Sequence, residues 1–122
     1  MGLAMSELDL DAQEFEALVI EELDFLPDEM VNGLENVAFV IEDRPEDGSL
    51  DILGLYDGIS ITERDQYGYG ELPDRIILYR EAHLAACETL GELRDEVHAT
   101  LVHEIGHFYG IDDEELHRLG WA

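Results

Sequence analysis

The sequence predicts one α+β domain, in which a small mixed sheet is combined with several helices. The chain has 122 residues, enough to bury one hydrophobic core and too few for two domains. Short apolar runs lie in the middle of the chain, and amphipathic helical patterns lie on both sides of them. Because these elements do not alternate as regular strand–helix–strand units, we expect an α+β arrangement over residues 1–122.

The N-terminal part predicts two helices. Asp11 and Glu14 have the spacing of an N-cap and its partner carboxylate. One helical stripe then contains the apolar residues Phe15, Leu18, Val19, Leu23 and Leu26. Pro27 is expected to open a second, short helix that runs through Met30 to Leu34, with Gly33 near its end.

The central part predicts short strands. Their composition is apolar and rich in β-branched or aromatic residues at positions 37–41, 53–56, 59–62 and 75–79. Asp57 and Gly58 separate the second and third of these and indicate a hairpin turn, and residues 67–70 are expected to form a loop. The strand at 75–79 is either an ordinary core strand or an edge strand that accepts an extended peptide.

The C-terminal part predicts the longest helix. Thr89 and Glu92 have the spacing of a capping box, and the helical pattern continues to about Tyr109. A last helical turn or two is expected over residues 112–119.

Two histidines within that long helix predict a metal site. His103 and His107 are four residues apart, so their side chains point the same way and can share one tetrahedral zinc ion. The stripe that is expected to be buried is a separate one, formed by Leu93, Val97, Leu101, Ile105 and Phe108. Glu104 lies at the boundary and can reach a zinc-bound water, from which it would take the proton as general base.

A zinc site needs a third protein ligand, and few residues remain to supply it. Only 15 residues follow His107, which excludes a glutamate on a helix some tens of residues later. Gly110 can end the helix and let the chain turn back. The next candidate ligands are Asp112, Asp113, Glu114, Glu115 and His117.

The pattern His103-Glu104-x-x-His107-x-x-Gly110-x-x-Asp113 resembles the extended zinc signature of zincin peptidases related to the metzincins. The chain is similar to a family of small bacterial zincin-like metallopeptidases, also through residues 53–56, 74–80 and 119–121. This resemblance implies a compact zincin-like domain with a long active-site helix, Zn²⁺ as cofactor, Asp113 as the third ligand and a peptide or protein substrate. His117 is the alternative ligand.

One feature departs from the metzincin pattern. Metzincins have a methionine turn after the third ligand, whereas the methionines of this chain are Met1, Met5 and Met30. The resemblance therefore predicts zinc binding more firmly than it predicts efficient proteolysis.

The charge balance disfavours several classes of partner. With 31 acidic and 6 basic residues, the formal net charge is −25, which disfavours nucleic acids and anionic membranes. The start of the chain lacks the pattern of a secretory signal, and no apolar run is long enough to span a bilayer, so we expect a cytoplasmic protein. Cys87, the only cysteine, allows no internal disulfide and no cysteine-based zinc cage.

Two other functions are consistent with parts of the pattern. Zinc could stabilise a non-catalytic binding protein. A metal-dependent endoribonuclease with three histidines has a similar ligand spacing, but Glu104, Asp113 and the negative charge oppose it.

Several further residues are weaker candidates. The tyrosines that could stabilise an oxyanion are Tyr69, Tyr79 and Tyr109. Glu96 falls on the metal stripe, although an exposed carboxylate is the favoured interpretation. His98 is expected to face away from the metal, and no role is predicted for His83.

Overall fold

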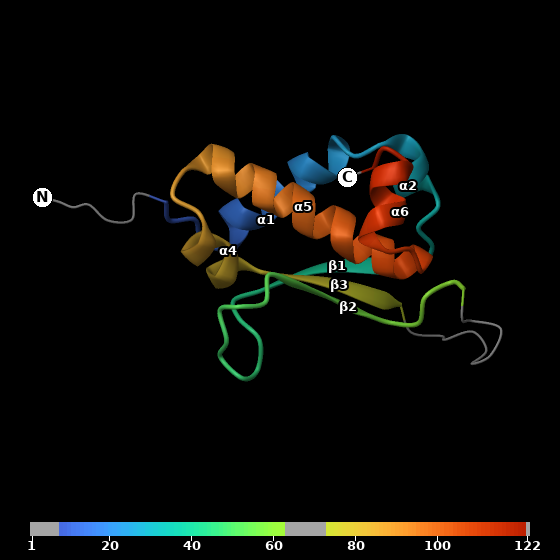
Figure 1. Ribbon diagram of the computed structural model, residues 1–122. Helices are drawn as coiled ribbons and strands as arrows, with labels where there is room; N and C mark the ends of the chain where they lie inside the picture. Colours follow the sequence, from blue (N-terminus) through green and yellow to red (C-terminus); the bar gives the residue numbers. More distant parts are fainter. Residues whose placement is uncertain (1–7, 63–72, 122) are drawn as a thin grey trace, which may run out of the picture.

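A three-stranded sheet with helices packed on one face forms the fold (Figure 1). The computed structural model describes residues 8–62 and 73–121. The elements are α1 (Ala12–Asp24), α2 (Asp28–Asn32), β1 (Val37–Glu42), β2 (Gly54–Asp57), β3 (Asp74–Tyr79), α4 (Arg80–Ala86), α5 (Leu90–Tyr109) and α6 (Asp113–Arg118). The predicted α+β class is thereby confirmed. None of the helices described here combines the length and the apolar character that crossing a membrane requires.

The first two helices begin at the predicted signals. The Asp11 side chain accepts from the Glu14 N–H at 2.8 Å, and the Glu14 side chain accepts from the Asp11 N–H at 2.9 Å. This reciprocal pair satisfies two N–H groups that the first turn of a helix leaves without partners. Helix α2 begins at Asp28, directly after Pro27 as predicted, and ends at Asn32, two residues before the expected end at Leu34.

The sheet has the order β1-β3-β2, with β1 parallel and β2 antiparallel to β3. Strand β3 is therefore central, and the interpretation of residues 75–79 as an edge strand is wrong. Four consecutive side chains of β3, from Ile76 to Tyr79, are buried, as expected for a strand that is covered on both faces. The edge position beside the long helix belongs to β2.

The predicted hairpin is wrong. Residues 59–62 form no strand, and the peptide N–H of Ile61 donates instead to the carbonyl of Phe108 at 3.0 Å. Strand β2 pairs with β3, so its partner lies about 20 residues further along the chain. Helix α4, which directly follows β3, was not expected from the sequence. The predicted loop at residues 67–70 lies outside the described residues.

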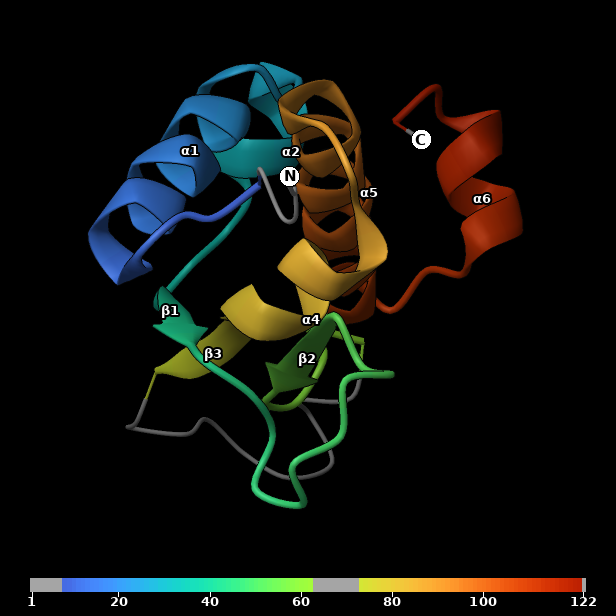
Figure 2. The ribbon, with the colours of Figure 1, turned by 90° about the vertical axis from the view of Figure 1, so that its left-hand side faces the viewer.

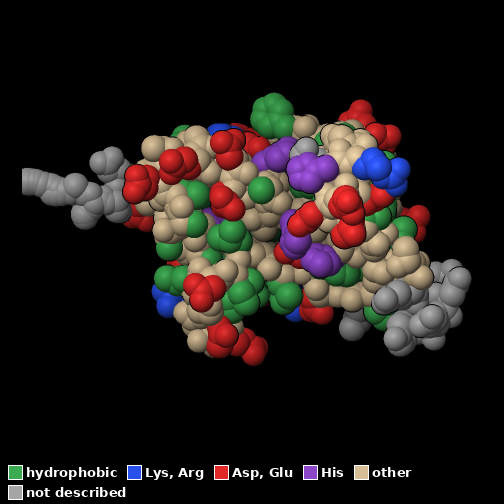
Figure 3. Space-filling model, viewed as in Figure 1, with side chains coloured by type: hydrophobic (Ala, Val, Ile, Leu, Met, Phe, Trp, Pro, Cys, Tyr) green, Lys and Arg blue, Asp and Glu red, His purple; other side chains and the backbone are tan. Residues whose placement is uncertain are grey.

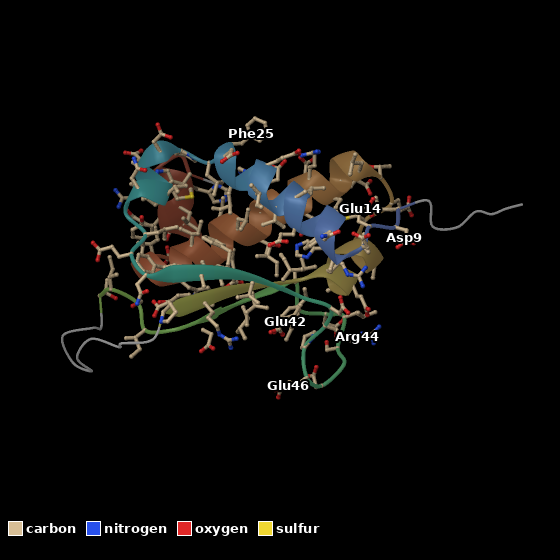
Figure 4. The ribbon with its side chains drawn as sticks, turned by 180° about the vertical axis from the view of Figure 1, so that it is seen from behind. Asp9, Glu14, Phe25, Glu42, Arg44 and Glu46 are labelled. Atoms are coloured by element: carbon tan, nitrogen blue, oxygen red, sulfur yellow. The ribbon has the colours of Figure 1, made fainter. Side chains whose placement is uncertain are left out.

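The main hydrophobic core lies between the helices and one face of the sheet. It combines side chains of α1, β3 and α5 that are fully buried, among them Phe15, Ile76, Leu78, Leu101 and Ile105. A smaller cluster on the other face contains Ile77, Tyr79 and Ala82. The loop that follows β1 contains Arg44 and Glu46 and extends below the sheet in Figure 4.

Two glycines determine how α5 ends and how closely α6 packs on it. Gly110 ends α5 in the left-handed conformation, with φ of 74°, as predicted. A Cβ on Gly106 would lie 3.1 Å from Leu116, so glycine here lets α6 pack closely on α5. Figure 2 shows α6 beside α5, on the side where β2 forms the edge of the sheet.

Candidate metal centre

His103 and His107 lie one turn apart on α5, with their rings nearly perpendicular. The ring centroids are 4.8 Å apart, and the two Nε2 atoms are 3.3 Å apart. Both side chains are about half exposed, at 50% and 54%. The two nitrogens therefore face one point that solvent and a substrate can reach.

This separation matches the requirement of a zinc ion. Tetrahedral zinc with nitrogen ligands at about 2.0–2.1 Å holds two such nitrogens about 3.3–3.4 Å apart. Imidazole nitrogen and carboxylate oxygen are also ligands that zinc accepts. The histidine pair therefore fits zinc in both chemistry and geometry.

Glu104 is buried beside this pair. Its residue exposure is 7%, and its Oε1 lies 3.9 Å from Nε2 of His107. Potential ligand atoms of His103, Glu104 and His107 all lie within 4.8 Å of one another. Burial raises the pKa of the Glu104 carboxyl, while His107, His103 and a hydrogen bond from the Tyr56 backbone act in the opposite direction.

Strand β2 approaches α5 closely at Gly54. A Cβ at this position would lie 2.6 Å from Cγ2 of Thr100 and 3.3 Å from Cγ of Glu104. The absence of a side chain thus brings β2 near enough for the peptide N–H of Tyr56 to reach the Glu104 carboxylate. Gly54 and Tyr56 are two residues apart in a strand, so both face the helix.

Tyr56 is a site residue that the sequence analysis missed. Its ring is stacked on the ring of His107, with centroids 6.5 Å apart and an interplanar angle of 4°. Its hydroxyl donates to Oδ2 of Asp74 at 2.5 Å. The alternation of Gly54 and Tyr56 was the available signal, but it could be used only once β2 was known to lie against α5.

Asp113 is the first residue of α6 and contacts His103. Its Oδ1 lies 3.1 Å from Nδ1 of His103. The nitrogen of His103 that faces His107 is the other one, Nε2. The side chain is 71% exposed, which leaves it room to change rotamer. His117, one turn further along α6, is exposed and shares a cavity wall with Asp113. The third ligand stays a prediction.

A cavity of about 690 Å³ adjoins the metal centre. Its walls come from residues 51–54, one side of α5 and α6, and they include His103, Glu104 and Asp113. Glu96 also lines it and is only partly exposed. Figure 3 shows histidine and carboxylate side chains together near the middle of this face of the molecule.

The described tyrosine candidates for an oxyanion contact lie elsewhere. Tyr79 is buried in the small cluster with Ile77 and Ala82. The hydroxyl of Tyr109 donates to the carbonyl of Met30 at 2.6 Å. Tyr69 lies outside the described residues.

His83 and His98 have other partners. The ring of His83 is fully buried, 2.9 Å from the Tyr79 carbonyl and 3.0 Å from the Thr100 hydroxyl. Nδ1 of His98 lies 4.0 Å from a carboxylate oxygen of Glu22 in α1, and the residue also borders the cavity.

Comparisons with known proteins agree with this arrangement. The model of the family described as zincin-like metallopeptidase matches residues 34–121. No curated protein gives a significant match. A solved structure of a conserved hypothetical protein from Thermo thermophilus has 24% sequence identity and a TM-score of 0.53, over 90% of this chain and 97% of that one. This second similarity shows a shared fold.

The family match covers β1 to α6, and therefore both the sheet and the helix that carries His103, Glu104 and His107. The chain belongs to the zincin-like metallopeptidase family.

Proposed function

We propose that this chain hydrolyses peptide bonds, with zinc held by His103, His107 and Asp113 and with Glu104 as general base. The observation that carries the proposal is the position of the Glu104 carboxylate, buried beside two Nε2 atoms that are 3.3 Å apart. When bound, zinc would polarise the scissile carbonyl and lower the pKa of a water molecule to about 7.

Glu104 has the properties of a general base. Burial raises the pKa of its carboxyl, which brings the proton affinity of a base closer to the working pH. The Tyr56 backbone N–H holds the carboxylate by a hydrogen bond and fixes its direction. Oε1 of Glu104 would take the proton of the attacking water and later give it to the leaving amine.

The position of β2 supports a peptide substrate. Within the described part of the chain, β2 pairs with β3 alone. An extended peptide can bind at such an edge by adding a strand. Because β2 touches α5 at Gly54 and Tyr56, a peptide bound there would pass close to the histidine pair.

The openness of the centre favours catalysis over a purely structural zinc. Structural zinc sites are closed by four protein ligands, whereas catalytic sites keep one position for water or substrate. Here both histidines are about half exposed, and a cavity adjoins them.

Digestion of a peptide library tests the proposal. The zinc-loaded chain should cut peptides, and a chelator should stop the reaction. Glu104→Gln should keep the zinc content and fold but slow cleavage by about 10²–10⁴-fold, the usual contribution of a general base. If the zinc-loaded chain cuts nothing and chelation unfolds it, the alternative of a zinc-stabilised binding protein is correct.

A further inference from the structure

The cavity beside the histidine pair is lined by apolar side chains, by carboxylates and by the histidines His98, His103 and His117. Apolar side chains come from the segment before β2, from α5 and from α6, and they include Ile52, Leu53, Val102 and Leu116. Carboxylates come from Asp51 and Glu96 at some distance from the histidines, and from Glu104 and Asp113 beside them. No arginine belongs to the described lining. A cavity of this kind suits a side chain with an aliphatic stem and a cationic end.

The carboxylates of Asp51 and Glu96 have no cationic partner within the described residues. Each arginine described here is paired elsewhere, and these pairs are Arg44–Glu81, Arg75–Asp57, Arg80–Asp43, Arg94–Glu21 and Arg118–Glu115. As far as the described residues go, the two carboxylates therefore remain available to a cation from outside the chain.

The distance between Glu96 and His103 along α5 suits a long side chain. Glu96 precedes His103 by seven residues, which is two helical turns or about 10 Å along the axis. A long side chain that starts from a carbonyl at the histidine pair and extends along the helix would bring its end near Glu96. The wall that faces α5 is held in place, because the Tyr79 N–H donates to the Leu53 carbonyl at 2.9 Å.

We infer that this cavity binds an arginine or lysine side chain of the substrate, next to the scissile peptide bond. The inference rests on the proposed peptidase function for the position of that side chain. The aliphatic stem lies against Ile52, Leu53 and Val102, and the cationic end pairs with Glu96 and Asp51. The net charge of −25 attracts such basic segments and speeds their association at low ionic strength.

Peptide binding to the zinc-loaded Glu104→Gln chain tests the inference without cleavage. Acetylated and amidated alanine-rich hexapeptides carry a fluorophore and one variable residue, which is arginine, lysine, norleucine or glutamate. Norleucine keeps most of the lysine stem and lacks the charge, so it separates the cationic contribution from the apolar one. The readout is the dissociation constant from fluorescence anisotropy in about 50 mM salt.

We expect the arginine and lysine peptides to bind more tightly than the norleucine peptide, by up to about fivefold, as one partly exposed ion pair allows. Adding Glu96→Gln or Asp51→Asn should reduce this preference. Adding Glu16→Gln, which makes the same change in net charge on an exposed position of α1, should leave it unchanged. Equal affinity for the arginine, lysine and norleucine peptides would overturn the inference, as would an equal effect of Glu16→Gln and Glu96→Gln.

The two proposals can fail separately. If the wild-type chain cuts no peptide but the preference for arginine and lysine depends on Glu96, the peptidase proposal fails and the cavity is still a site for cationic side chains. If the chain cuts peptides with norleucine as fast as those with lysine, the peptidase proposal stands and the inference about the cavity is wrong.

Discussion

The peptide N–H of Tyr56 in β2 donates a hydrogen bond to the carboxylate of Glu104 in α5. This contact joins the edge of the sheet to the candidate general base. It exists because Gly54, two residues earlier, lets β2 approach the side chains of Thr100 and Glu104. The position of the carboxylate therefore depends on the absence of one side chain in the strand.

Gly54→Ala tests this dependence. The new Cβ would lie 2.6 Å from Cγ2 of Thr100 and 3.1 Å from the Ile77 carbonyl. Thr100 is buried and its hydroxyl is hydrogen bonded, so β2 has to move away. We expect the free energy of unfolding to fall by about 1–3 kcal/mol, and peptide cleavage to slow as Glu104 loses its hydrogen bond.

Gly91→Ala is the matched control for that substitution. Gly91 lies in the first turn of α5, and an added Cβ would have its nearest neighbour at 3.9 Å. Alanine is favoured over glycine within a helix by up to about 1 kcal/mol, so this variant should be as stable as the wild type or more stable. Chemical denaturation of both variants measures the difference, and equal effects would contradict the role of Gly54.

Removal of either histidine should abolish stoichiometric zinc binding. His103→Ala and His107→Ala each delete one of the two Nε2 atoms that are 3.3 Å apart, and the remaining ligands are too few for a tetrahedral site. Elemental analysis of the purified chain should find about one zinc ion per wild-type chain and much less in either variant. His98→Ala, which alters a histidine of the same helix beside Glu22, should keep the metal. Full zinc occupancy in both ligand variants would exclude this site.

Asp113→Ala distinguishes a zinc ligand from a residue that orients His103. Partners that only orient a ligand typically change metal affinity by 10–100-fold, so the loss of a direct ligand should exceed that range. The structure has Asp113 beside Nδ1 of His103, and a change of rotamer would be needed for direct binding. Competition with a chromogenic chelator gives the zinc affinity. His117→Ala is the parallel variant, and a larger loss there would make His117 the third ligand.

The helix that carries the candidate metal centre could be predicted because its signals are local. The Thr89 side chain accepts from the Glu92 N–H at 3.1 Å, which is one half of the predicted capping box. The Glu92 carboxylate accepts from the Glu88 N–H at 2.8 Å instead of from Thr89. Gly110 has the left-handed φ that ends the helix. The four-residue spacing of His103 and His107 then puts both rings on one face, whatever the rest of the fold is.

The surroundings of that helix could not be predicted in the same way, because they depend on contacts between distant segments. Residues 59–62 and Ile76–Tyr79 are both rich in β-branched or aromatic residues, and nothing local indicates which of them pairs with β2. Tyr56 belongs to the site only because β2 lies against α5. His83 is likewise buried by residues far away in the sequence, since its ring meets Thr100 and Phe15.

That buried histidine should make stability depend on pH. The Tyr79 carbonyl can only accept, so Nδ1 of the neutral His83 ring carries the proton. Nε2 lies 3.0 Å from the Thr100 hydroxyl, whose single proton is accepted either by Nε2 or by the Glu96 carbonyl at 2.9 Å. Burial lowers the pKa of His83 below its ordinary value of 6.5, because the charged ring would lose its hydration. Below pH 6.5 the unfolded chain therefore binds more protons at this residue than the folded chain does. Stability that is present above that pH is lost as the pH falls through the folded pKa.

Comparison with His83→Gln isolates this contribution. Carboxylates also titrate as the pH falls, but they are common to both chains, so the relevant quantity is the difference in slope of unfolding free energy against pH. With zinc removed from both chains, the wild type should lose stability more steeply than the variant between pH 7 and pH 5, by at most about 1.4 kcal/mol per pH unit. Urea denaturation at a series of pH values measures both slopes. Parallel slopes would mean that His83 binds protons equally in the folded and unfolded chains. The burial of His83 between Tyr79 and Thr100 would then make no contribution to the acid sensitivity of the fold.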